Sequence, residues 1–286
     1  PEALRHCTVH NLRLEFQMRL TDTPQFSDSK FYKYRPWNQY SEDVIAKNEI
    51  FFSSPAEVND PFDCRFPDIV PPTDEQLTAY MKYQYLNLRS PNRDRSRVHG
   101  GVMLLNSLVE ANMGTHGPPS WEATINRAKE MILEQSSFCS LSSISNSSLM
   151  FAHYAAGHTG VCFEFHYTLE FSFGHVEAVI YEDKFSAIDL FNDPDCDDDC
   201  LVQAAIYQKH LDWAYEKEWR IFNLGEMRGV YTFDQRCLSG IIFGCKMPEK
   251  DRERARKLVQ NREMKPKIYE AIMEPDGYSL EVRELT

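Results

Sequence analysis

The sequence lacks the signatures of the most common nucleotide-binding and hydrolase sites. It contains neither GxGxxG nor GxxxxGK[ST], so a Rossmann dinucleotide site and P-loop phosphoryl transfer are both unsupported. GxSxG and HExxH are missing too, which removes the signatures of the nucleophile elbow and the common zinc peptidases. No apolar run approaches the roughly 20 residues that a membrane-spanning helix needs. These absences predict a soluble protein without a membrane partner.

Cysteine and positive charge are also scarce. Eight cysteines among 286 residues are too few for a disulfide framework, and most of them sit in apolar runs, which predicts reduced thiols and a cytoplasmic location. Lys and Arg number 31 against 43 Asp and Glu, and this net charge of −12 argues against recognition by bulk phosphate attraction. The 42% of hydrophobic residues is ample for a packed core.

The hydrophobic pattern predicts an α+β fold. Residues 1–30 are expected to form an N-terminal extension, and residues 31–286 a single β-rich domain with a helical insertion at about 73–135. Because strict alternation of strands and helices is absent, a doubly wound parallel sheet is disfavoured. Strands are expected at 31–35, 50–52, 137–141, 161–165, 177–181, 218–223, 239–243, 267–273 and 278–283, with helices at 41–49, 147–156, 201–214 and 248–261.

A charged strand near the start is the first candidate for a binding site. In Tyr32-Lys-Tyr-Arg35 the period of two puts Lys33 and Arg35 on one face and Tyr32 and Tyr34 on the other. A cationic face beside an aromatic face suits a ligand with phosphates and flat rings. The alternative interpretation is an edge strand with one solvated face.

A second candidate is the charged segment Tyr215-Glu-Lys-Glu-Trp-Arg220. Taken as a strand, it places Glu216, Glu218 and Arg220 on one face, directly before apolar residues. A partly buried carboxylate needs a partner such as Arg, so a structural ion pair is one interpretation. The other is that one Glu holds a sugar hydroxyl or a developing positive charge.

Two further patterns allow either a structural or a functional interpretation. Met150 and Tyr154 lie one helical turn apart with His153 beside them, which is typical of a core face as well as of a pocket. Asn59, Asp60 and Asp63 are typical of a turn, and they are also hard oxygen ligands for Mg²⁺.

Six segments in this order carry a family resemblance that covers about residues 31–283. They are Tyr32-Lys-Tyr-Arg35, Phe52-Ser-Ser-Pro55, Asn59-Asp-Pro-Phe-Asp63, Met150-Phe-Ala-His-Tyr-Ala155 with Gly157-His-Thr-Gly160, Glu216-Lys-Glu-Trp-Arg220 and Ile241-Ile-Phe-Gly244. The chain resembles a mainly bacterial family of uncharacterised domains. The layout of these segments is also similar to the ADP-ribosyltransferase fold, whose members split NAD at the bond between nicotinamide and ribose.

The resemblance implies a set of roles. NAD would be the cofactor, consumed as a substrate, and Glu218 would be the catalytic carboxylate, with Glu216 competing for that place. The NAD-binding residues would be Lys33, Tyr34 and Arg35 on the first strand, Ser140 and Ser142 on the second, and Met150, His153 and Tyr154 on the following helix. The account requires the cationic strand and the acidic strand to lie side by side along one cleft.

The sequence therefore predicts an NAD-consuming mono-ADP-ribosyltransferase-like enzyme of toxin, effector or defence type, acting on an unidentified protein or nucleic acid. One alternative is a metal-dependent nuclease or phosphoesterase that uses Asn59, Asp60, Asp63 and Glu216. The other is a non-catalytic interaction or sensor module that binds through the insertion. If the protein is such an interaction module, we expect no pocket joining residues 33–35, 150–154 and 216–220.

Overall fold

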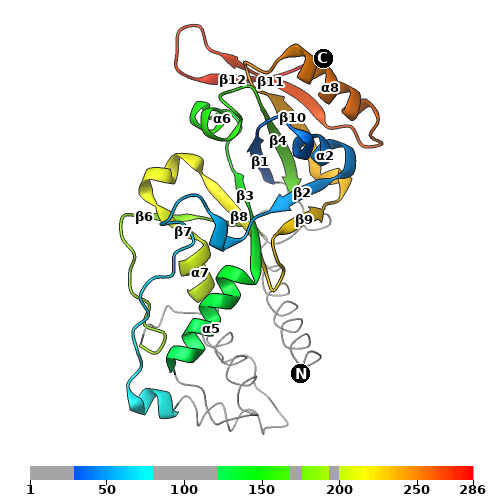
Figure 1. The fold of residues 1–286 in the computed structure, drawn as a ribbon. Coiled ribbons are helices and arrows are strands. Elements are labelled where there is room, and N and C mark those ends of the chain that lie inside the picture. The colour runs from blue at the N-terminus through cyan, green and yellow to red at the C-terminus, as the bar shows by residue number, and fades with distance from the viewer. Residues whose placement is uncertain (1–28, 80–120, 168–175, 193–199, 286) are drawn as a thin grey trace.

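The computed structural model describes residues 29–79, 121–167, 176–192 and 200–285 (Figure 1). The expected N-terminal extension lies almost wholly outside the described residues. The expected helical insertion is described only at its two ends, as a helical segment at 74–79 and the helix α5 (Trp121–Glu134).

An eight-stranded sheet forms the centre of this α+β fold, with the strand order β12-β11-β10-β4-β1-β3-β8-β5 (Figure 1). Only β10 and β11 pair in parallel; the other neighbours are antiparallel. The strands are β1 (Ser29–Arg35), β3 (Ser136–Ser142), β4 (Val161–Tyr167), β5 (Val176–Ala178), β8 (Glu218–Leu224), β10 (Leu238–Phe243), β11 (Lys267–Met273) and β12 (Leu280–Glu284).

Smaller elements surround the sheet. Two short ribbons pair β2 (Glu49–Phe52) with β9 (Gly229–Thr232) and β6 (Ile180–Glu182) with β7 (Gln208–His210). The remaining elements are the helices α2 (Gln39–Lys47), α6 (Ser148–Tyr154), α7 (Cys200–Ile206) and α8 (Glu249–Gln260), and the 3-10 turns η2 (Pro55–Glu57), η4 (Leu211–Glu216) and η5 (Gln235–Cys237).

Most of the expected elements are confirmed, and two expectations near the candidate site are wrong. The helix expected over 201–214 ends at Ile206, because the chain turns there into β7 and η4. The strand expected over 177–181 is divided, since the Val179 amide bonds to Glu218 of β8 whereas the Ile180 amide bonds to Tyr207. This exchange of partners carries the chain from the main sheet to the ribbon with β7.

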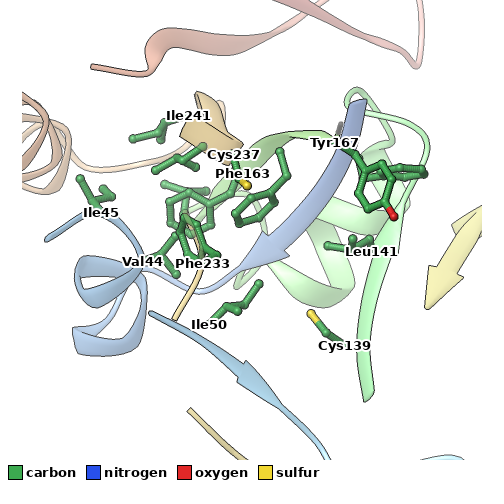
Figure 2. Close-up of a cluster of buried hydrophobic side chains, with 14 of the residues drawn as sticks. Val44, Ile45, Ile50, Cys139, Leu141, Phe163, Tyr167, Phe233, Cys237 and Ile241 are labelled. Carbon is green, nitrogen blue, oxygen red and sulfur yellow. The ribbon is translucent and has the colours of Figure 1, made fainter. Parts of the chain in front are cut away.

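Hydrophobic clusters cover both faces of the sheet. On one face α2 and α8 pack together, and Val44 and Ile45 of α2 lie in a cluster with Phe163 and Ile241 of the sheet (Figure 2). On the other face Tyr34 of β1 packs with α6. A third cluster joins α5 and α7 to β3 and β8. Because side chains alternate along each strand, neighbouring residues of a strand point to opposite faces of the sheet and join different clusters.

Three of the six resemblance segments meet at a tight backbone crossing. The Gly244 amide donates to the Gly160 carbonyl at 3.0 Å. A Cβ atom on Gly160 would lie 2.2 Å from the Arg35 carbonyl oxygen, and one on Gly244 would lie 2.2 Å from the His158 carbonyl oxygen. These glycines are therefore needed for the close approach of three chain segments, which is a structural requirement.

Other features bear on the expected environment. Within the described part of the chain, no helix is long and apolar enough to cross a membrane. The cysteines whose side chains the structure describes, at positions 64, 139, 162, 237 and 245, are free thiols, as expected.

We predict that Gly244→Ala lowers the free energy of unfolding by about 2 kcal/mol or more, because the new methyl group would overlap a backbone carbonyl that cannot move away alone. Gly229→Ala is the matched control, since its Cβ would meet nothing closer than 3.9 Å. Urea unfolding of both variants checks this, and equal stabilities would contradict the account of the crossing.

Candidate functional site

Five charged side chains are buried together where β7, η4, β8 and the turn after η2 meet. We call this group the charge cluster, and it consists of Asp63, Lys209, Glu216, Glu218 and Arg220. Arg220 is 0% exposed, Glu216 3% and Glu218 4%. Charges this deeply buried persist only when they are paired and hydrogen-bonded.

Arg220 of β8 holds two of the carboxylates. Its Nε lies 2.8 Å from Glu218 Oε1, and its Nη2 lies 2.9 and 2.8 Å from the two carboxylate oxygens of Asp63. Nη1 donates to the Ile206 carbonyl at 2.6 Å, at the end of α7. The guanidinium therefore fixes the turn 59–64, the end of α7 and the start of β8 relative to one another.

Lys209 of β7 joins the remaining carboxylate to the cluster. Its Nζ lies 2.6 Å from Glu216 Oε2, 2.9 Å from Glu218 Oε2 and 3.6 Å from Asp63 Oδ2. The other oxygen of Glu216 accepts a hydrogen bond from the Tyr154 hydroxyl of α6. Ser147 begins that helix by accepting a hydrogen bond from the Met150 amide, so a local cap positions Tyr154 toward Glu216.

The strand expected to carry Glu216, Glu218 and Arg220 on one face is partly wrong. Lys217 has a left-handed φ of 46° and ends η4, so β8 begins only at Glu218. Glu216 therefore reaches the cluster from a 3-10 turn. The two carboxylates still meet, because both bind Lys209.

The charges of the cluster do not cancel. Three carboxylates face two cations, which leaves a formal charge of −1. Burial by itself raises the pKa of Glu218, but the charges of Arg220 and Lys209 more than offset it and hold the pKa at about 2. Burial and then the hydrogen bond to Glu216 raise the pKa of Tyr154. At neutral pH, Glu218 is therefore ionised and the Tyr154 hydroxyl keeps its proton.

A cavity of about 290 Å³ lies against the charge cluster, and we call it the first cavity. β1 and β3 are bridged only at Tyr32 and Ser142, and residues of both strands line the cavity. Lys33 crosses this region and donates to the Ser140 carbonyl at 2.7 Å. The predicted site residues in the lining are Lys33, Tyr34, Ser140, Met150, Tyr154, Glu216 and Glu218.

Three residues predicted to bind the cofactor lie elsewhere. Arg35 does not line the first cavity, and its buried Nε has no hydrogen-bond partner among the described residues. Ser142 is buried and donates to the Glu216 carbonyl at 2.6 Å, so it supports the cavity wall. His153 is exposed on α6, where its ring lies 6.0 Å from that of Tyr215.

The expectation that the cationic strand β1 and the acidic strand β8 lie side by side is also wrong. β3 lies between β1 and β8 and pairs with both of them. Lys33 and Glu218 nevertheless line the same cavity. The non-catalytic alternative expected no such cavity, so its structural expectation is contradicted.

The carboxylates of the turn 59–63 accept hydrogen bonds from protein donors. Both oxygens of Asp63 accept from Arg220, and Asp60 Oδ1 accepts from the Phe62 amide at 2.9 Å. Within the described ranges, no group of three His, Cys, Asp or Glu side chains is arranged to hold a metal ion. The residues named for a metal-dependent nuclease are thus largely engaged with other partners.

Sequence reasoning missed Lys209 altogether. This residue lies in Gln208-Lys-His210, directly after an apolar helix, and nothing in that spacing distinguishes it from a solvated lysine. The one usable signal is a charge deficit. Arg220 alone does not supply enough positive charge for three carboxylates, those of Asp63, Glu216 and Glu218. This deficit indicates a second buried cation.

Comparison with known proteins finds a family that part of the chain matches. Residues 150–221, from α6 into β8, match the model of a family described as "Protein of unknown function (DUF2971)". This match supports the expected relationship to a family of uncharacterised domains and gives no activity. Neither a curated protein nor a solved structure matches the chain.

We predict that Glu218→Gln is destabilised by about 3 kcal/mol at neutral pH, since the pKa falls from its ordinary 4.5 to about 2 on folding. Because the folded value is the lower one, this stability is present above pH 4.5 and is lost as the pH falls toward 2. Urea unfolding should therefore show the variant and the unmutated chain converging in acid. A constant difference at every pH, or an equal effect of the exposed control Glu281→Gln, would contradict it.

Proposed function

We propose that the first cavity binds NAD and that the protein is an NAD-consuming, mono-ADP-ribosyltransferase-like enzyme of toxin, effector or defence type. The observation that carries this proposal is the meeting of Lys33, Tyr154, Glu216 and Glu218 in one cavity, although they come from distant parts of the chain. The resemblance of the motif order to the ADP-ribosyltransferase layout supplies the choice of NAD.

The charge of the cluster suits the chemistry. When the bond between ribose C1′ and the nicotinamide nitrogen breaks, its electron pair leaves with nicotinamide, which becomes neutral. Positive charge develops on the ribose as this bond breaks, an acceptor nucleophile forms the new bond to C1′, and the proton of that nucleophile is released to solvent. Fixed negative charge in a buried site stabilises such a transition state, because it needs no reorganisation during the reaction. The formal −1 of the charge cluster would supply it.

The two carboxylates would contribute unequally. Among the described residues, the Glu218 carboxylate binds both Lys209 and Arg220, whereas the Glu216 carboxylate binds Lys209 and the neutral Tyr154 hydroxyl. The uncompensated charge therefore lies on the side of Glu216, which we assign to the ribose hydroxyl and the developing cation. Glu218, with its pKa at about 2, would act as a fixed charge and not as a proton carrier.

The rest of the lining would hold the nicotinamide end of the ligand. Met150 and the ring of Tyr154 offer apolar surface to a flat ring, and Lys33 offers a cation to a phosphate. The 290 Å³ of the cavity is at the low end for ligand pockets, so the adenosine half would extend beyond it.

We predict that Glu216→Gln lowers the rate of nicotinamide release from NAD by about 100-fold, the usual effect of removing one electrostatic contact to a transition state. The substitution keeps the shape of the side chain and leaves the pairing of Glu218 with Lys209 and Arg220 intact. Glu249→Gln on α8 is the matched control and should keep the full rate.

The assay measures nicotinamide by chromatography, with circular dichroism to verify folding. Equal rates for Glu216→Gln and the unmutated chain would remove the proposed role of Glu216. If the unmutated chain releases no nicotinamide in the presence of protein or nucleic-acid acceptors, the assignment of NAD is wrong.

A further inference from the structure

A larger second cavity of about 670 Å³ adjoins the first, and the proposed function assigns no ligand group to it. Asn59 and Lys209 line both cavities. The rest of the second cavity is formed by the turn 59–65, the end of β6 with the residues after it (182–185), and residues 208–213 of β7 and η4. Its wall includes most of the Asn59-Asp-Pro-Phe-Asp63 segment, one of the six that carry the family resemblance.

Aromatic rings from three separate segments line the second cavity. Phe62 is 55% exposed and Phe185 is 38% exposed, and Trp213 of η4, also in the lining, is half-buried. Exposed rings gathered in a concave site are a feature of ligand pockets. Two of these rings already bind cations of the protein itself. The Arg65 guanidinium carbon lies 5.5 Å from the centroid of the Phe185 ring, and Lys209 Nζ lies 5.1 Å from the centroid of the Trp213 ring.

Negative charge predominates in the lining. Carboxylates are contributed by Asp60, Glu182, Asp183 and Asp212, and cations outside the charge cluster by Arg65 and Lys184, which gives a formal charge of −2. Lys209 is left out of this count because the charge cluster already neutralises it. Glu182 and Asp183 form no ion pair with any residue that the structure describes. The cavity therefore favours a flat cation and disfavours phosphate.

We infer that the second cavity binds a guanidinium group, presented as an arginine side chain by a protein partner. A guanidinium is planar, stacks on aromatic rings and donates two parallel hydrogen bonds to a carboxylate, none of which an ammonium does as well. The exposed apolar side chains of Leu211, between the lining residues His210 and Asp212, and of Ile180, two residues before Glu182, offer further surface that a polypeptide would cover. A bound arginine would lie beside the first cavity, across Asn59 and Lys209.

Isothermal titration of the full chain, without NAD, with three blocked tripeptides tests this inference. Each peptide carries arginine, lysine or citrulline between two glycines, and citrulline matches the shape of arginine without its charge. We expect the arginine peptide to bind best and the citrulline peptide to bind about tenfold more weakly, because the carboxylates then face no cation. Free arginine should bind more weakly than the peptide.

Variants locate the binding in the cavity. Phe62→Ser and Asp183→Asn each remove an exposed lining group and should weaken arginine binding by about fivefold, in the range of one cation–π or charged contact. Met273→Ser on β11, also exposed, is the control and should bind as the unmutated chain does.

Three results would overturn the inference. Equal binding of the arginine and citrulline peptides would remove the role of charge, and free arginine binding as tightly as the peptide would remove the protein partner. Preferential binding of AMP that Phe62→Ser abolishes would make this a nucleotide cavity. Because no NAD is present, none of these results bears on nicotinamide release, so the two proposals fail separately.

Discussion

The guanidinium of Arg220 lies in the interior without access to water, and the surrounding chain is arranged to neutralise it. Two carboxylates are required nearby, and they come from Glu218 on the same strand and from Asp63, which is 157 residues away in sequence. The bond to Asp63 holds the turn 59–64 against β8, and the same guanidinium donates to the Ile206 carbonyl at the end of α7. Breaking a buried pair of this kind typically costs about 3–5 kcal/mol of stability, so replacing one member alone destabilises the protein.

The charge balance of this cluster links the fold to the proposed chemistry. Lys209 satisfies Glu218 and also binds Glu216, so the second cation comes with a third carboxylate and the sum stays negative. A purely structural network would gain from exact neutrality, because an excess charge in the interior is costly. The excess lies where Glu216 and Tyr154 face the first cavity, and a substrate that becomes cationic during its reaction would complete the balance.

The sequence predicts the local parts of this structure well and the long-range parts poorly. Alternation identifies β1, β3 and β8, and the spacing of Glu218 and Arg220 in a strand predicts their pairing, because these are properties of neighbouring residues. The left-handed backbone at Lys217 has no local signature, so the conformation of Glu216 was misjudged. The partnership of Asp63 with Arg220 and the two cavities depend on how distant segments pack, which periodicity does not encode.

The central claim is that the charge cluster and the first cavity together form an NAD site, and a crystal structure of the protein with a non-hydrolysable NAD analogue tests it most directly. The account predicts the nicotinamide ring against Met150 and Tyr154, with a ribose hydroxyl within hydrogen-bond distance of Glu216. An analogue bound elsewhere on the molecule, with the first cavity filled only by solvent, would contradict it.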